Sequence, residues 1–97
     1  MHINPPSSDT VNSQNESEFI TFILSLGTAT LMYLGEVPDF ETQQVATDLP
    51  AAEENIRIIS LLREKTKGNL DSQESQMLET ILYDLRLKFV KAKELKK

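Results

Sequence analysis

The sequence predicts an all-α protein, a three-helix bundle in which a long apolar first helix is followed by a hairpin of two amphipathic helices. Three observations lead to this prediction. Residues 19–35 contain no charged side chain. Two later segments repeat apolar residues at helical spacing. A lysine-rich turn that contains a glycine lies between those two segments, as expected where one helix ends and another begins.

The length of 97 residues allows one small domain. We assign residues 1–17 to a disordered polar tail that includes the only histidine, His2. Residues 18–94 form a single helical domain, and residues 95–97 form a frayed basic end. Small cores are marginally stable and are commonly reinforced by disulfides, metals or oligomerisation. The chain has no cysteine, which fits a cytoplasmic location and leads us to expect a homodimer.

The first helix is predicted to begin near a cap at Ser17 and to end at Gly35, a residue suited to a left-handed closing position. Its apolar side chains cover most of the helix circumference, so it should be buried on at least two sides. We expect one edge to meet a second copy and the other to face the bundle, although these two edges could be exchanged. The residues of the self-association edge are Phe22, Leu26, Ala29 and Tyr33, and those expected to face the bundle are Ile20, Leu24 and Leu31.

A membrane span is the alternative interpretation of this helix. Its 17 uncharged residues are at the lower limit for crossing a bilayer. Hydroxyl side chains reduce its hydropathy, and no Lys or Arg flanks it closely to set an orientation. We therefore expect a helix packed against protein.

Residues 36–48 are predicted to form a solvated connection with Phe40 or Val45 packed on the bundle. Its acids Asp39, Glu41 and Asp48 do not have the spacing of a calcium-binding loop, and no glycine among them provides the sharp turn. We expect no metal site in this loop.

The second helix is predicted to start at Asp48, which can cap it. Glu53 and Arg57 have the spacing of a helical ion pair. Residues 65–70 are interpreted as a structural turn closed by Gly68, with anion binding as the alternative. The core positions of this helix are Ala52, Ile56, Ile59 and Leu62, with Ile58 and Leu61 widening the stripe.

The third helix is predicted to run from Ser72 to about Lys93. Asp71 and Glu74 have the spacing of a capping box at its start, and Asp84 and Lys88 that of an ion pair. Its apolar seam comprises Leu78, Ile81, Leu82, Leu85 and Phe89.

Charge is distributed unevenly along the chain. Every Lys and Arg lies at or beyond Arg57, whereas residues 1–56 carry nine acids and no base. We interpret this asymmetry as complementarity within the chain or between subunits. The alternative is an adaptor that binds RNA, the ribosome or an anionic lipid surface through its basic tail. That tail comprises Arg86, Lys88, Lys91, Lys93, Lys96 and Lys97.

Three segments together resemble a bacterial family catalogued as domain of unknown function 1844. They are residues 34–39 (Leu-Gly-Glu-Val-Pro-Asp), residues 61–70 with their Lys-Thr-Lys-Gly-Asn turn, and residues 82–86. Phe40 and Arg57 depart from the pattern, at positions where a proline and an acid are common. The resemblance implies a small, soluble, mostly helical protein with no assigned activity, and it identifies no catalytic or ligand-binding residue.

The sequence contains no recognisable catalytic constellation. We find no nucleophile paired with a base, no cluster of metal ligands and no glycine-rich phosphate loop. We therefore expect neither an enzyme nor a cofactor. The expected function is that of a non-catalytic, homo-oligomeric interaction or scaffold module, with an unidentified protein as a further partner.

Overall fold

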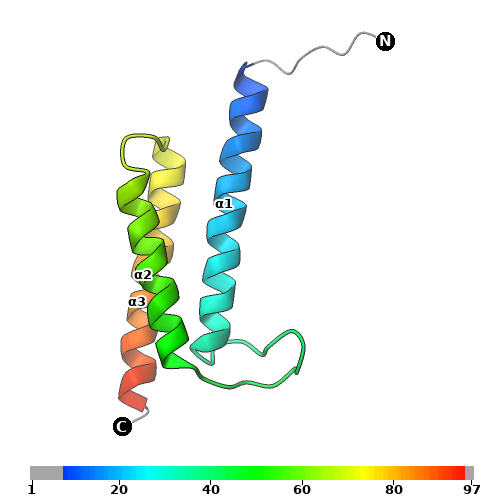
Figure 1. Ribbon diagram of the computed structural model, residues 1–97, viewed down its shortest axis with the longest axis vertical. Coiled ribbons are helices and arrows are strands. Elements are labelled where there is room, and N and C mark those ends of the chain that lie inside the picture. Colours follow the sequence, from blue (N-terminus) through cyan, green and yellow to red (C-terminus); the bar gives the residue numbers. More distant parts are fainter. Residues whose placement is uncertain (1–7, 96–97) are drawn as a thin grey trace.

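The computed structural model describes residues 8–95, with side chains described from Glu18 onward. It contains helices α1 (Ser8–Tyr33), α2 (Leu49–Lys65) and α3 (Ser72–Leu95). Each helix contacts the other two. Figure 1 shows α1 and α3 running in one direction and α2 in the other. The predicted three-helix bundle is therefore confirmed.

Helix α1 begins at Ser8, well before the cap predicted at Ser17. No proline or glycine lies between Pro6 and Gly27. Once the apolar segment is helical, each preceding residue can extend the helix by one backbone hydrogen bond at little cost. Residues 1–7 of the predicted tail lie outside the described residues.

The C-terminus of α1 is closed by a left-handed glycine, as predicted. Gly35 has a φ of +78°, which favours glycine because other residues would place a Cβ too close to their own backbone. The Glu36 N–H donates to the Leu31 carbonyl at 2.9 Å, and the Gly35 N–H donates to the Met32 carbonyl at 3.0 Å. These two bonds form a Schellman motif, which satisfies carbonyls that the helix end would otherwise leave unpaired.

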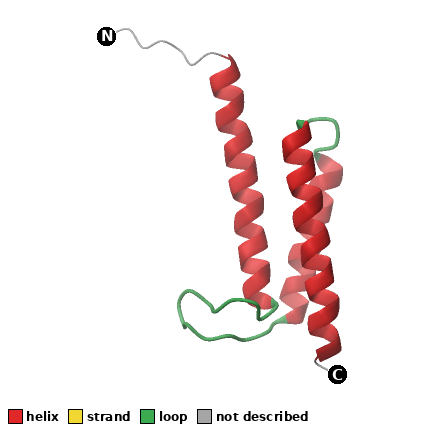
Figure 2. Ribbon diagram, turned by 180° about the vertical axis from the view of Figure 1, so that it is seen from behind, coloured by secondary structure: helices red, strands yellow, loops and turns green. Residues whose placement is uncertain are grey.

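The long loop between α1 and α2 is tied together at its base. Leu34 and Thr47 form an isolated antiparallel bridge, and the Asp48 N–H donates to the Tyr33 carbonyl at 2.7 Å. Figure 2 shows this loop at one end of the bundle and the short α2–α3 turn at the other. The prediction that Phe40 or Val45 would pack on the bundle is wrong, since they are 70% and 60% exposed. The loop is held at its base by these backbone bonds and by the side chain of Leu34, which is buried in the core.

The starts of α2 and α3 are capped as predicted. The Asp48 carboxylate accepts a hydrogen bond from the Ala51 N–H at 3.1 Å. At the start of α3, the Glu74 N–H donates to the Asp71 carboxylate at 2.7 Å, and the Asp71 N–H donates to the Glu74 carboxylate at 3.0 Å. This reciprocal pair is a capping box. Helix α3 ends at Leu95, slightly beyond the predicted end near Lys93, and Lys96 and Lys97 lie outside the described residues.

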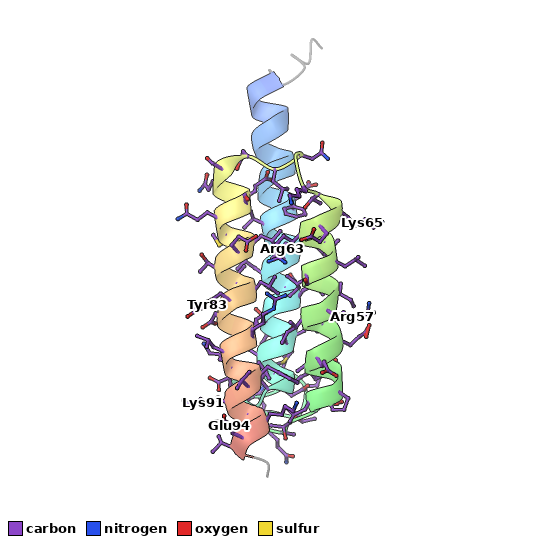
Figure 3. The ribbon with its side chains drawn as sticks, turned by 90° about the vertical axis from the view of Figure 1, so that its left-hand side faces the viewer. Arg57, Arg63, Lys65, Tyr83, Lys91 and Glu94 are labelled. Carbon is purple, nitrogen blue, oxygen red and sulfur yellow. The ribbon has the colours of Figure 1, made fainter. Side chains whose placement is uncertain are left out.

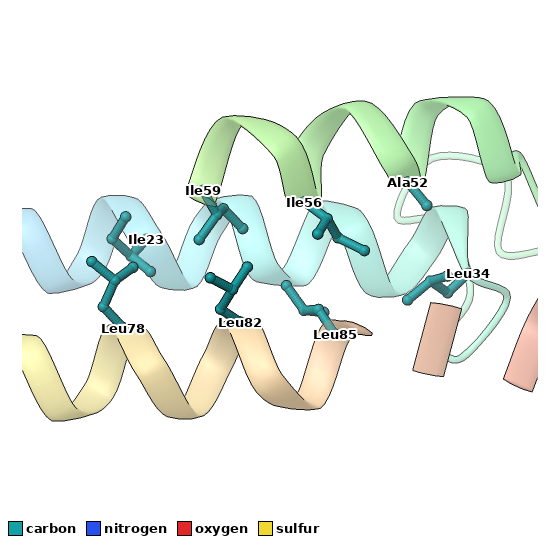
Figure 4. Close-up of a cluster of buried hydrophobic side chains, with 8 residues drawn as sticks. All are labelled: Ile23, Leu34, Ala52, Ile56, Ile59, Leu78, Leu82 and Leu85. Atoms are coloured by element: carbon teal, nitrogen blue, oxygen red, sulfur yellow. The ribbon is translucent and has the colours of Figure 1, made fainter. Parts of the chain in front are cut away.

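The core runs along the centre of the bundle, with contributions from all three helices (Figure 4). The predicted seams of α2 and α3 are confirmed, because their central residues are buried. Leu62, Ile81 and Phe89 pack against this core while partly buried. The buried apolar residues are Ile23, Leu34, Ala52, Ile56, Ile59, Leu78, Leu82 and Leu85.

The inward face of α1 differs from the prediction. Leu24 is 47% exposed, whereas Ile23, Gly27, Thr30 and Leu34 are buried. The Thr30 hydroxyl donates to the Leu26 carbonyl at 2.6 Å, so its burial leaves no hydroxyl unpaired. The small side chains at positions 27 and 30 let the α1 backbone approach its neighbours closely. The larger Leu24 would hold them apart.

Replacing Gly27 with alanine is expected to raise the free energy of unfolding by about 0.5–1 kcal/mol, because glycine is a poor residue for a helix interior. A Cβ at this position would lie 3.6 Å from Ile81 Cγ2, an ordinary van der Waals distance. Urea denaturation of Gly27→Ala and wild type at equal protein concentration measures the change. A loss of stability would show that the contact between α1 and α3 is tighter than this distance indicates.

Candidate self-association surface

The side of α1 that faces away from the bundle carries no charge over residues 19–35. We call this surface the outer face of α1. Phe22 on one flank is 51% exposed, and Leu24 on the other is 47% exposed. Exposed apolar area of this kind commonly marks an interaction site. Between these flanks lie the smaller side chains of Thr21, Ser25, Thr28, Ala29 and Met32.

The outer face of α1 is shallowly hollowed. The hollow has a volume of about 510 Å³, and Phe40 from the long loop forms part of its lining. The Ser25 hydroxyl donates to the Thr21 carbonyl at 2.9 Å, so this hydroxyl is already bonded within the helix. A surface of this kind offers shape and apolar area to a partner, with few groups that could carry out chemistry.

The four residues predicted to mediate self-association lie in different environments. Phe22 and Tyr33 are exposed, and Ala29 is partly buried. Leu26 packs against the core of its own chain. Their spacing of four, three and four residues places them along one edge of the helix. Three of them are therefore available to a partner, while Leu26 supports them from within.

Helix α2 adds two residues next to this edge. Arg86 of α3 donates to the Ser60 hydroxyl at 3.2 Å, so Ser60 marks the flank of α2 that faces α3. Ile58 lies on the opposite flank, toward α1, and is partly buried. Leu61 points away from the core and is 47% exposed. The sequence predicts that both residues widen the apolar stripe of α2, and for Leu61 that prediction is wrong. The offset of Leu61 from the buried positions 52, 56 and 59 is the signal that could have shown its outward direction.

Acidic residues in the long loop and at the start of α2 stabilise local turns. The Asp39 carboxylate accepts from the backbone N–H groups of Glu41 at 2.7 Å and Thr42 at 3.1 Å, and Asp48 caps α2. Among the side chains of residues 18–95, no group of three or more acidic or histidine residues is arranged to hold a metal ion. The carboxylates of Asp39 and Asp48 thus have structural roles in the turns.

The basic tail is partly engaged with its own bundle. Besides the bond from Arg86 to Ser60, Lys88 pairs with Asp84 at 2.7 Å, which confirms the predicted ion pair. The Lys93 ammonium lies 5.9 Å from the centroid of the Phe89 ring. Lys91 is exposed, whereas Lys96 and Lys97 lie outside the described residues. The contacts of Arg86, Lys88 and Lys93 account for part of the basic tail without an external ligand.

Arg57 pairs with Glu54, whereas the sequence predicted a pair with Glu53. Both carboxylates are within one helical turn of the arginine, and the side-chain conformation decides between them. The hydrogen bond from Arg57 lowers the pKa of Glu54, and the same bond raises the pKa of Arg57. A second pair, Arg63 with Glu79 at 3.2 Å, joins α2 to α3.

The turn between α2 and α3 is structural, as predicted. Gly68 has a φ of +87°, and the Thr66 hydroxyl donates to the Leu62 carbonyl at 2.7 Å. A hollow of about 310 Å³ adjoins the turn, but Glu64 and Glu79 contribute to its lining beside the bases. These carboxylates make the hollow a poor match for an anion.

These features define a class of protein, a small helical bundle with an apolar surface on its first helix. Within the described residues, no helix has the length and hydropathy needed to cross a membrane. The chain belongs to the DUF1844 family, because the model of that family, a domain of unknown function, matches residues 16–91. No curated protein and no solved structure matches the chain.

Proposed function

We propose that this protein is a non-catalytic interaction module that forms a homodimer through the outer face of α1. The observation that supports the proposal is the exposure of Phe22, Leu24 and Tyr33 on a helix surface without charge. An isolated molecule would leave this apolar area in water, at a cost of about 25 cal/mol for each Å². A two-fold dimer removes it from water on both copies at once, since the same patch contributes from each side.

The adaptor alternative, in which the basic tail binds RNA, the ribosome or anionic lipid, has less support. Arg86, Lys88 and Lys93 already contact Ser60, Asp84 and Phe89 of the same chain. An external anion would compete with the pair between Lys88 and Asp84. The apolar surface on α1 has no comparable partner within residues 18–95.

Phe22→Asp is expected to convert the dimer to a folded monomer. A carboxylate at this position would be buried without a partner in the interface, whereas in the monomer it would remain in water. Phe22 is 51% exposed, so its replacement should leave the core and the helical circular dichroism intact. Light scattering on protein eluting from a sizing column gives the molar mass.

Tyr83→Asp provides the matched control. Tyr83 is an aromatic residue that is 67% exposed, and Figure 3 shows it projecting from α3 on the side away from α2. This variant should remain dimeric. A monomeric wild type, or a Phe22→Asp variant that stays dimeric, would overturn the proposal.

A further inference from the structure

We infer that the outer face of α1 docks on α2 of a second copy, with Glu18 of one chain beside Lys65 of the other. This inference rests on the proposed homodimer and specifies which surfaces meet. The resulting interface is a four-helix arrangement made of α1 and α2 from each copy. It assigns roles to Ile58 and Leu61, which the fold of the single chain leaves partly or largely exposed.

The outward surface of α2 has an apolar centre and charged ends. Glu54, Ile58, Leu61 and Lys65 follow one another at intervals of four, three and four residues, so they share one face of the helix. Figure 3 shows Lys65 at the edge of α2 that points away from α3. The pair of apolar residues in the middle of this face is the natural counterpart of the apolar edge of α1.

Glu18 and Lys65 lie at the same end of the bundle. Helices α1 and α2 run in opposite directions (Figure 1), so the N-terminal part of α1 lies beside the C-terminal part of α2. Glu18 is exposed at the start of the uncharged stretch, and Lys65 is exposed at the last position of α2. Each chain thus presents an acid and a base at one end, on two neighbouring helices.

Charge complementarity selects among the two-fold arrangements. Packing α1 on α1 in parallel would set Glu18 against its own copy. Packing α1 on α1 in antiparallel fashion would bring Glu18 to the end of α1 where Glu36 lies beside Lys88 and Lys91 of its own chain, so Glu18 would gain no base from α1 itself. Packing α1 on α2 with both copies pointing the same way instead brings Glu18 to Lys65 of the second copy. Like charges disfavour the first arrangement, the second gains no ion pair between the packed helices, and opposite charges favour the third.

The rest of the interface is consistent with this choice. At the far end of α2, Glu54 is already neutralised by Arg57 of its own chain, so Tyr33 would meet a balanced ion pair. Neighbouring helices would also run antiparallel throughout, as in up-and-down four-helix bundles. A second copy of the chain therefore matches both the apolar residues of the outer face of α1 and the charge of Glu18.

Disulfide trapping tests the arrangement, because the chain has no cysteine to interfere. Glu18→Cys and Lys65→Cys are purified separately as full-length proteins, mixed and oxidised, and the cross-linked peptides are identified by mass spectrometry. A disulfide forms only when two Cβ atoms come within about 4.5 Å. We expect the mixed species, joining residue 18 of one chain to residue 65 of the other, to predominate.

The other arrangements give different products. Rapid cross-linking of Glu18→Cys to itself would indicate parallel packing of α1 on α1, and a mixed product with Glu36→Cys would indicate antiparallel packing. Either product would overturn the inference while leaving the homodimer in place. A monomeric wild type by light scattering would instead overturn the proposed function. A wild-type dimer that gives no mixed product between positions 18 and 65, and whose affinity is not restored by exchanging the two charges, would also overturn the inference.

Charge reversal gives a second readout of the same contact. Glu18→Lys and Lys65→Glu should each raise the dimer dissociation constant by about 2- to 30-fold, the effect of losing two exposed ion pairs, since the contact occurs once on each side of the two-fold axis. The double variant should return the constant toward the wild-type value, with Lys67→Glu as a control outside the contact. Additive weakening in the double variant would contradict pairing between these residues.

Discussion

Leu82→Ala is expected to lower the free energy of unfolding by about 2–5 kcal/mol, the range measured when buried leucines are truncated. Leu82 is 1% exposed and lies in the middle of the core cluster on α3 (Figure 4). Its removal would leave a cavity that α1 and α2 cannot fill without moving their backbones. Because a small core has little stability to spare, the variant should be close to unfolding at moderate temperature.

Leu87→Ala is the matched control for this prediction. It removes the same atoms from the same helix, but Leu87 is 54% exposed and its loss should change stability by about 0.5 kcal/mol or less. Urea denaturation of both variants is compared at one protein concentration, since dimerisation makes apparent stability depend on concentration. Equal losses from the two variants would mean that position 82 is not part of a packed core.

Gly35→Ala is expected to destabilise the protein more than Gly68→Ala. Both glycines have left-handed backbones, with φ of +78° and +87°, so alanine at either position costs about 1–2 kcal/mol in backbone strain. A Cβ at Gly35 would in addition lie only 2.7 Å from Thr47 Cγ2, whereas a Cβ at Gly68 would have no neighbour within 4 Å. Crowding of that kind adds about 1–3 kcal/mol.

The comparison between the two glycines isolates the contact with Thr47. Thr47 is held by its bridge to Leu34 and by the bond from the Asp48 N–H to the Tyr33 carbonyl, so it cannot move away easily. Thermal denaturation of the two variants measures the difference. Adding Thr47→Ala to Gly35→Ala should recover part of the lost stability. Equal destabilisation by the two glycine substitutions would show that the loop around Thr47 shifts to accommodate the new Cβ without loss of stability.

Self-association through the outer face of α1 would add to the stability that the small core provides. Among residues 18–95, eight apolar residues are buried, which is a modest core for an independent domain. Covering the outer face of α1 would add stabilisation that depends on protein concentration. The proposed interface and the core are adjacent on α1, since Leu26 packs inward between the exposed Phe22 and Tyr33. A substitution at Leu26 would therefore affect folding and assembly together, which is why Phe22 is the better probe.

The sequence alone determined the helical architecture, the end of α1, the starts of α2 and α3, and the inward faces of α2 and α3, but not the start of α1 at Ser8. Gly35, Asp48 and the pair of Asp71 with Glu74 act through local backbone geometry, so their roles can be predicted without the fold. The apolar residues of α2 and of α3 occupy only one side of each helix. Each helix can therefore bury them in only one orientation.

Tertiary structure decided the orientation of α1 and therefore the candidate surface. Apolar residues cover most of the circumference of α1 between residues 19 and 34, so their periodicity does not decide whether the flank of Phe22 or the flank of Leu24 is buried. Gly27 and Thr30 turn inward because their small size permits close packing, and this leaves Phe22 and Leu24 outside. The choice between Glu53 and Glu54 as the partner of Arg57 likewise depended on side-chain conformation. Helix ends follow from contacts between residues close in sequence, whereas the outward face of an apolar helix depends on how well its other faces fit their neighbours.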